Sequence, residues 1–161
     1  MIQKINEKQN ILGDNIGFVE NWDFSRANLN EENRILAITQ VASICYQNPK
    51  AIGSESLYNR LLAESKGLPS SSFEFVPVLF NYRDLNVQYF MNSASNLGYS
   101  NALKYGEILN INGIEYLLTN YRALIYDVEN LSLNKSVLQQ FNTPEECEII
   151  KQHFKVFKYK V

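Results

Sequence analysis

The chain has 161 residues, of which 45% are hydrophobic and 20% are charged, and its formal net charge is −2 at pH 7. This length and composition are typical of a single globular domain that buries a core. The slightly acidic balance argues against a protein whose main task is to grip nucleic acid through its phosphates. It leaves open a small anionic ligand held by a few local arginines.

The residues that most often carry metal or nucleophilic chemistry are few. Cys45 and Cys147 stand far apart and show no metal-ligand spacing, which predicts two reduced, buried thiols in a cytoplasmic protein. The single histidine, His153, argues against a histidine-based metal site or a Ser-His-Asp triad. The first 15 residues lack the apolar segment of a signal peptide, and no apolar run approaches the roughly 20 residues that span a bilayer.

The first half of the chain predicts a strand, two helices and a second strand. β-branched and aromatic residues predict a strand over 16–24. A helix is expected over 31–47 with Asn30 as its N-cap, and a second helix over 54–66. The apolar face of the first helix consists of Ile38, Val41, Ala42 and Cys45. The face of the second consists of Leu57, Leu61 and Leu62, with Tyr58 beside them and Gly67 after the last turn.

The segment "GLPSSSFEFVPVLF" follows, from Gly67 to Phe80. Its second half is dense in residues that favour strands, so Glu74 is expected within a strand. Pro77 lacks a backbone N–H group, which predicts an edge or bulged position for that strand.

The second half is harder to interpret from pattern alone. Residues 81–140 are predicted to be an insertion with irregular pieces, within which Asn112-Gly113 predicts a type I′ β-hairpin. A short helix is expected after Asn120, with Leu124, Ile125 and Val128 available to pack.

The C-terminal part carries the clearest helix start. Thr143 as N-cap, Pro144 at the first position and Glu146 at the third predict a helix that starts with a capping box. Alternating residues over 157–161 predict a last strand, and its abrupt end suggests a chain that continues beyond Val161.

No phosphate-binding loop, dinucleotide fingerprint, CxxC or HExxH motif is present, so motifs alone name no reaction. A first candidate site is the serine turn Ser70–Ser72 with Glu74, whose hydroxyls and carboxylate suit a ribose, a phosphate or an adenine amine. The same residues also suit a solvated loop and an outward-facing acid.

Two further groups of polar residues also suit either a ligand site or an ordinary solvent-facing surface. Arg122, after Asn120 and Tyr121, either binds a phosphate bidentately or forms a surface ion pair with Asp127 or Glu129. Three lysines near the C-terminus form either a basic patch or the solvent face of a strand: Lys155, Lys158 and Lys160.

Four segments, taken in order, resemble the N-terminal part of the flavin-dependent thymidylate synthases (ThyX). They are "GFVE" at 17–20, "ITQVASICYQ" at 38–47, "LYNRLLAESKG" at 57–67 and "PSSSFEFVPVLF" at 69–80. The resemblance covers roughly half of the chain. Later, "YLLTNYRAL" and "TPEECEIIKQHF" are similar to an insertion and a helix in epsilonproteobacterial-type members.

The resemblance implies that Ser71 and Glu74 contact FAD. Phe75 stands where the family has a histidine, and the family's R-H-R-x-x-S catalytic signature does not occur in these residues. The resemblance therefore implies an N-terminal portion that has no catalytic residue of its own and no metal site. This portion alone is expected to be inactive. The whole enzyme would be a cytoplasmic homotetramer that converts dUMP to dTMP with methylenetetrahydrofolate and NADPH.

We therefore expect a single α+β domain over residues 1–161, with a mixed or antiparallel sheet and the helices near 31–47 and 54–66 on one face. A non-catalytic ligand-binding or interaction domain of the same fold is the alternative. A nucleic-acid accessory protein is a third possibility, which the acidic balance disfavours.

Overall fold

The computed structural model describes residues 11–13, 22–46, 49–63, 70–81, 101–131 and 135–154. Short 3-10 helices, written η, alternate with α-helices and strands. The elements are α1 (Glu31–Tyr46), η2 (Pro49–Ala51), α2 (Glu55–Leu62), η3 (Ser71–Phe75), β1 (Pro77–Asn81), α5 (Asn101–Lys104), β2 (Glu107–Ile111), β3 (Ile114–Asn120), α6 (Tyr121–Leu131), η4 (Lys135–Gln139) and α7 (Pro144–His153). No helix in these ranges is long and apolar enough to cross a membrane.

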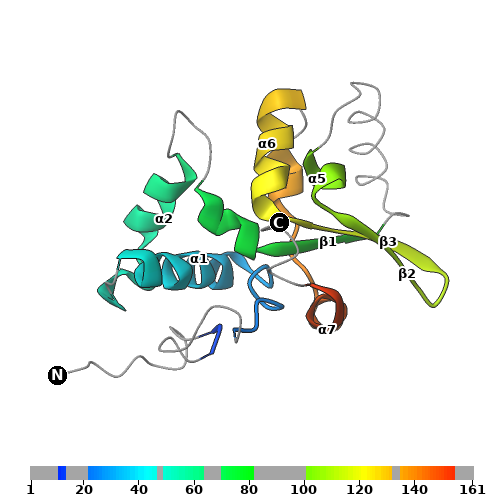
Figure 1. Ribbon diagram of the computed structural model, residues 1–161, viewed down its shortest axis with the longest axis horizontal. Helices are drawn as coiled ribbons and strands as arrows, with labels where there is room; N and C mark the ends of the chain where they lie inside the picture. The colour runs from blue at the N-terminus through cyan, green and yellow to red at the C-terminus, as the bar shows by residue number, and fades with distance from the viewer. Residues whose placement is uncertain are drawn as a thin grey trace.

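The three strands form an antiparallel sheet in the order β1-β3-β2 (Figure 1). β2 and β3 are joined by the predicted two-residue hairpin, whose Asn112 and Gly113 have φ of 53° and 82°. These left-handed values are those of a type I′ turn, which Asn-Gly adopts at low cost. Residues 81–140, expected as an insertion, thus supply two of the three strands, including the central one.

Helices cover both faces of this sheet, which makes the fold α+β as expected but corrects the expectation of helices on a single face. Leu117 and Phe80 face the larger apolar cluster together with Leu124 of α6. On the opposite face, Leu79 and Leu118 pack with Ile150 of α7. Figure 1 shows α5 and α6 above the sheet and α7 below it. Strand residues alternate between two buried faces, so the sheet is the middle layer.

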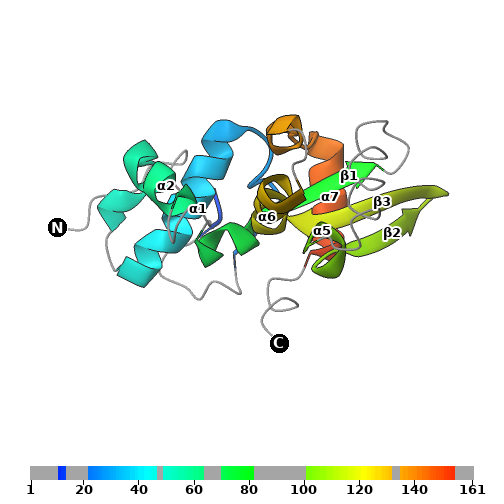
Figure 2. The same cartoon turned by 90° about the horizontal axis from the view of Figure 1, so that it is seen from above.

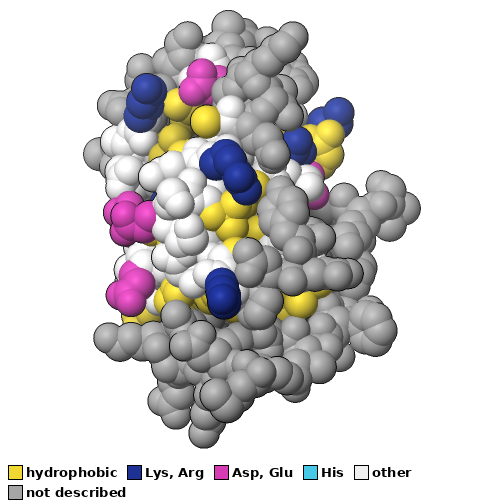
Figure 3. All heavy atoms as spheres, turned by 90° about the vertical axis from the view of Figure 1, so that its left-hand side faces the viewer, with side chains coloured by type: hydrophobic (Ala, Val, Ile, Leu, Met, Phe, Trp, Pro, Cys, Tyr) yellow, Lys and Arg dark blue, Asp and Glu magenta, His cyan; other side chains and the backbone are white. Residues whose placement is uncertain are grey.

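α1 and α2 lie beside one end of the sheet and pack against each other and η3, not on a sheet face (Figure 2). Asn30 caps α1 as predicted, since its Oδ1 accepts from the backbone N–H of Asn33 at 2.7 Å. The predicted apolar face is buried at Ile38, Val41 and Ala42. The side chain of Cys45 lies outside the described residues. Figure 3 shows the end of the molecule that bears these helices, where acidic and basic side chains are interspersed.

Several local expectations differ from the structure. Trp22–Phe24 are not in a strand; instead Asp23 donates its N–H to Leu12 O at 2.9 Å, and 16–21 lie outside the described residues. α2 ends at Leu62 with Ala63 as its C-cap, earlier than the expected residue 66. The expected final strand at 157–161 and Gly67 also lie outside the described residues.

Pro77 begins β1, an edge strand, as its missing N–H group predicted. α6 buries Leu124, Ile125 and Val128, the residues expected to pack. α7 begins with the predicted capping box. In it, Thr143 Oγ1 accepts from Glu146 N at 3.2 Å and Glu146 Oε1 accepts from Thr143 N at 2.9 Å.

Candidate functional site

Glu74 lies on η3, a 3-10 helix that ends before β1, and not in the strand that the sequence predicted. Ser70 caps η3, because its hydroxyl accepts from the N–H group of Ser72 at 3.3 Å. Residues three apart lie on the same side of a 3-10 helix, so Ser71 and Glu74 share one side. Phe73 is completely buried, so the helix turns its apolar side inward and this pair outward.

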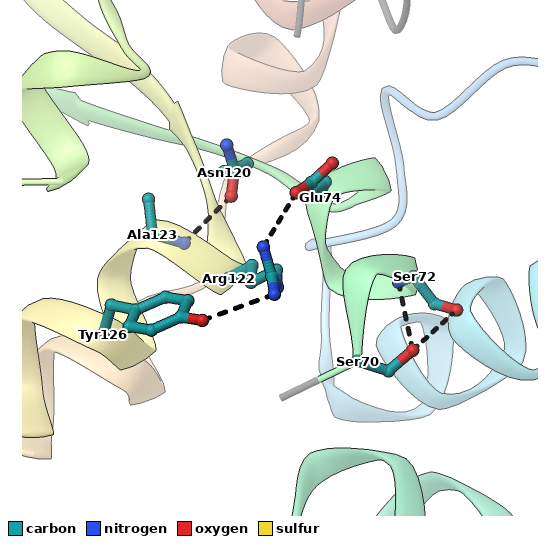
Figure 4. Close-up of polar contacts among 7 residues, drawn as sticks. All are labelled: Ser70, Ser72, Glu74, Asn120, Arg122, Ala123 and Tyr126. Carbon is teal, nitrogen blue, oxygen red and sulfur yellow. Dashed lines mark hydrogen bonds and ion pairs between the residues drawn. The ribbon is translucent and has the colours of Figure 1, made fainter. Parts of the chain in front are cut away.

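Arg122 of α6 lies against Glu74, 48 residues away in sequence (Figure 4). Its Nη1 donates to Glu74 Oε1 at 2.9 Å, and the two side chains are 28% and 34% exposed. Its Nη2 donates to the hydroxyl of Tyr126 at 3.3 Å, and the guanidinium carbon lies 5.1 Å from that ring's centre. Partly exposed pairs of this kind typically contribute about 0.5–1 kcal/mol to stability, so the pair alone does not explain the fold.

The backbone around this pair brings the two segments together. β3 runs directly into α6, and Asn120 caps that helix by accepting from Ala123 N at 2.9 Å. The N–H of Tyr121 donates to Val76 O at 2.9 Å, next to the last residue of η3. The register pairs Pro77 with Asn120, so the end of η3 and the start of α6 must meet.

The structure therefore joins Glu74 and Arg122, which the sequence presented in separate candidate groups, whereas Ser70 and Ser72 hydrogen-bond to each other. An ion pair of Arg122 was one of the expected alternatives, but the expected partners Asp127 and Glu129 were wrong. Asp127 is completely buried and accepts from the N–H groups of Asn101 and Ala102 at 2.8 and 2.9 Å, which caps α5. Glu129 is exposed on α6.

Sequence reasoning missed Tyr126 as a member of the site. The spacing of four residues between Arg122 and Tyr126 puts both on one side of a helix, so the helical pattern contained the signal. The partnership of Glu74 and Arg122 had no such local signal, because it depends on the pairing of β1 with β3.

The outward side of η3 offers two groups to a ligand. Ser71 is exposed, and Glu74 Oε2 accepts no hydrogen bond within the described part of the chain. A hydroxyl and a carboxylate oxygen on one turn bind hydroxyl or amine groups, and the adjacent guanidinium favours an anion. These groups therefore suit a ligand that combines hydroxyls or amines with phosphate.

Among the described residues, the other reactive side chains that the sequence offered do not come together in a site. Cys147 is a free, buried thiol as predicted, and burial raises its pKa, so it is not an activated nucleophile. Within the described ranges, no group of His, Cys, Asp and Glu side chains could hold a metal ion. The C-terminal lysines Lys155, Lys158 and Lys160 lie outside those ranges.

Comparison of the chain with protein-family models, curated proteins and solved structures found no match.

Proposed function

We propose that this chain is the N-terminal part of a flavin-dependent thymidylate synthase and that the outward side of η3 contributes to its FAD site. Two features support the proposal: the ordered resemblance of four segments, and the placement of Ser71 and Glu74 on one side of η3. When bound, FAD supplies hydride transfer from NADPH, and the complete cytoplasmic homotetramer methylates dUMP to dTMP with methylenetetrahydrofolate.

The observation that carries the proposal is the contact of Arg122 with Glu74 on the side of η3 that also bears Ser71. An isolated outward acid binds water, but an acid beside a hydroxyl and a guanidinium forms a polar site with complementary groups. Glu74 and Ser71 would hold hydroxyl or amine groups of FAD, such as those of the ribose or adenine. Arg122 would contribute positive charge toward its phosphates.

The experiment is a titration of FAD with the chain, followed by quenching of flavin fluorescence. Glu74→Gln keeps the size of the side chain but removes its charge and one acceptor, so we expect a dissociation constant about tenfold higher. Glu129→Gln, a change of the same type on the exposed side of α6, should leave affinity unchanged. Absence of saturable quenching, or equal affinity in the Glu74 variant, would contradict the proposal.

A non-catalytic ligand-binding or interaction domain is the second candidate, and the ion pair itself favours it. Glu74 already has Arg122 as a partner, as in a structural pair that needs no ligand. In that case Glu74→Gln lowers the stability of the chain slightly, and neither the parent chain nor the variant quenches flavin.

A further inference from the structure

A buried arginine, Arg34 of α1, lies near the candidate site without touching it. It is only 3% exposed, and within the described ranges no carboxylate accepts a hydrogen bond from it. A buried guanidinium is costly unless its N–H groups are satisfied, so its neutral acceptors must hold it tightly. Its neighbours are therefore informative about its role.

Two segments fix the plane of the Arg34 guanidinium. Nε and Nη2 both donate to Asn28 Oδ1, and Nη1 donates to Leu138 O at 3.2 Å. Asn28 is completely buried and is itself held, since its Nδ2 donates to Gln140 O at 2.9 Å. The planar fork of an arginine loses its freedom to turn when acceptors on several sides engage it.

The same guanidinium reaches Tyr121, the first residue of α6. Nη1 donates to the Tyr121 hydroxyl at 3.1 Å, and the guanidinium carbon lies 4.0 Å from the centre of the ring. Tyr121 also contacts η3 through its ring, which lies 5.9 Å from that of Phe73, and the C-cap of η3 through its N–H bond to Val76 O. Tyr121 thus connects the fixed guanidinium with the turn that carries Glu74.

We propose that Arg34 is a positioning residue, which holds Tyr121 so that Arg122 meets Glu74. Arg122 follows Tyr121 directly, and Glu74 lies two residues before Val76, so the position of Tyr121 relative to η3 sets the distance between Arg122 and Glu74. The consequence for ligand binding rests on the proposed function, but the positioning itself does not, and the first test uses no ligand.

The first test measures the energetic coupling between Glu74 and Arg122 by a double-mutant cycle in urea unfolding. In the parent chain, Glu74→Gln and Arg122→Gln should show a coupling of about threefold in the unfolding equilibrium constant. In the Tyr121→Phe background the coupling should vanish. A merely structural role of the hydroxyl would destabilise all four corners of the cycle equally and leave the coupling intact, which would overturn the proposal.

The matched control is Tyr116→Phe, a half-buried tyrosine of β3, which should leave the coupling at its parent value. If Tyr121→Phe does not fold, Arg34→Lys replaces it, because an ammonium keeps the charge but lacks the planar fork. The coupling should vanish there too, and its persistence would overturn the proposal.

Titration of FAD with the same variants separates this inference from the proposed function. Loss of coupling together with weaker FAD binding supports both. Loss of coupling in a chain that binds no FAD supports positioning and contradicts the proposed function. Retained coupling, with FAD bound equally well by the parent chain and the Tyr121 variant, overturns positioning alone.

Discussion

At the scale of single residues, the Asn142 side chain forms two hydrogen bonds with the backbone of Leu79, as a neighbouring strand would. Its Oδ1 accepts from Leu79 N at 3.1 Å, and its Nδ2 donates to Leu79 O at 2.8 Å. These contacts satisfy backbone groups on the outer edge of β1, with which no strand pairs among the residues that the structure describes. An edge covered in this way offers fewer free groups to a second chain. Asn28 Nδ2 also donates to this Oδ1, at 3.3 Å, which links the edge to Arg34.

We expect Asn142→Asp to lower the free energy of unfolding by about 2–4 kcal/mol at pH 7. The variant keeps an acceptor for Leu79 N but loses the donor to Leu79 O, and it buries a charge. Urea unfolding checks this, with Asn110→Asp as the control, because that exposed side chain only accepts from Gly113 N. The loss should shrink at acidic pH, where the introduced carboxyl is protonated and can donate again. Equal stability of both variants would contradict this role of Asn142.

At the scale of elements, what the sequence predicted correctly depends on neighbours in the chain. The Asn112-Gly113 turn and the capping box at Thr143 are satisfied within four residues, so local pattern was sufficient. The expected strand at Glu74 failed because strand propensity is overridden when a capped turn buries Phe73. Pairing between distant segments, such as Glu74 with Arg122, has no local signal at all.

The junction between α5 and β2 is a further case that depends on packing, because Gly106 leaves no room for a side chain. A Cβ there would lie 2.3 Å from Ala102 O and 3.0 Å from Leu118 O. We expect Gly106→Ala to destabilise the chain by at least about 2 kcal/mol, since backbone must move to relieve the contact.

Thermal unfolding followed by circular dichroism measures this effect. Gly113→Asn is the matched control, because Gly113 has φ of 82° with nothing within 4 Å of an added Cβ, and asparagine tolerates that conformation. A Gly106 variant with the melting temperature of the parent chain would show that the junction adapts without cost.

At the scale of the whole molecule, a buried polar network joins parts of the chain that also meet in the larger apolar cluster. Arg34 bonds to the N-terminal turn at Asn28, to the C-terminal part at Leu138 and to α6 at Tyr121. A substitution of one member of such a network costs stability, because the remaining polar partners stay buried without a hydrogen bond. The candidate site on η3 therefore depends on segments from the whole length of the described chain.

The buried tyrosines of this network also make the stability of the chain fall at alkaline pH. Burial raises the pKa of Tyr58 and of Tyr121 above the usual value of about 10, and the charge of Arg34 only partly opposes this. A raised pKa means that the folded state keeps protons that the unfolded state releases. Stability is therefore complete below about pH 10 and falls as the pH rises above it.

We expect the contribution of these tyrosines to the free energy of unfolding, measured by urea unfolding, to be nearly constant from about pH 7 to 9. Above about pH 10 this contribution should decline. Tyr58→Phe should flatten the decline, because one of the two groups no longer titrates. Refolding after return to pH 7 controls for irreversible damage. An equal slope in the variant and the parent chain would show that Tyr58 does not contribute to the pH dependence. The phenylalanine ring should retain the contact with Phe73, whose centre lies 5.4 Å from that of Tyr58, so the slope and not the stability at pH 7 is the decisive quantity.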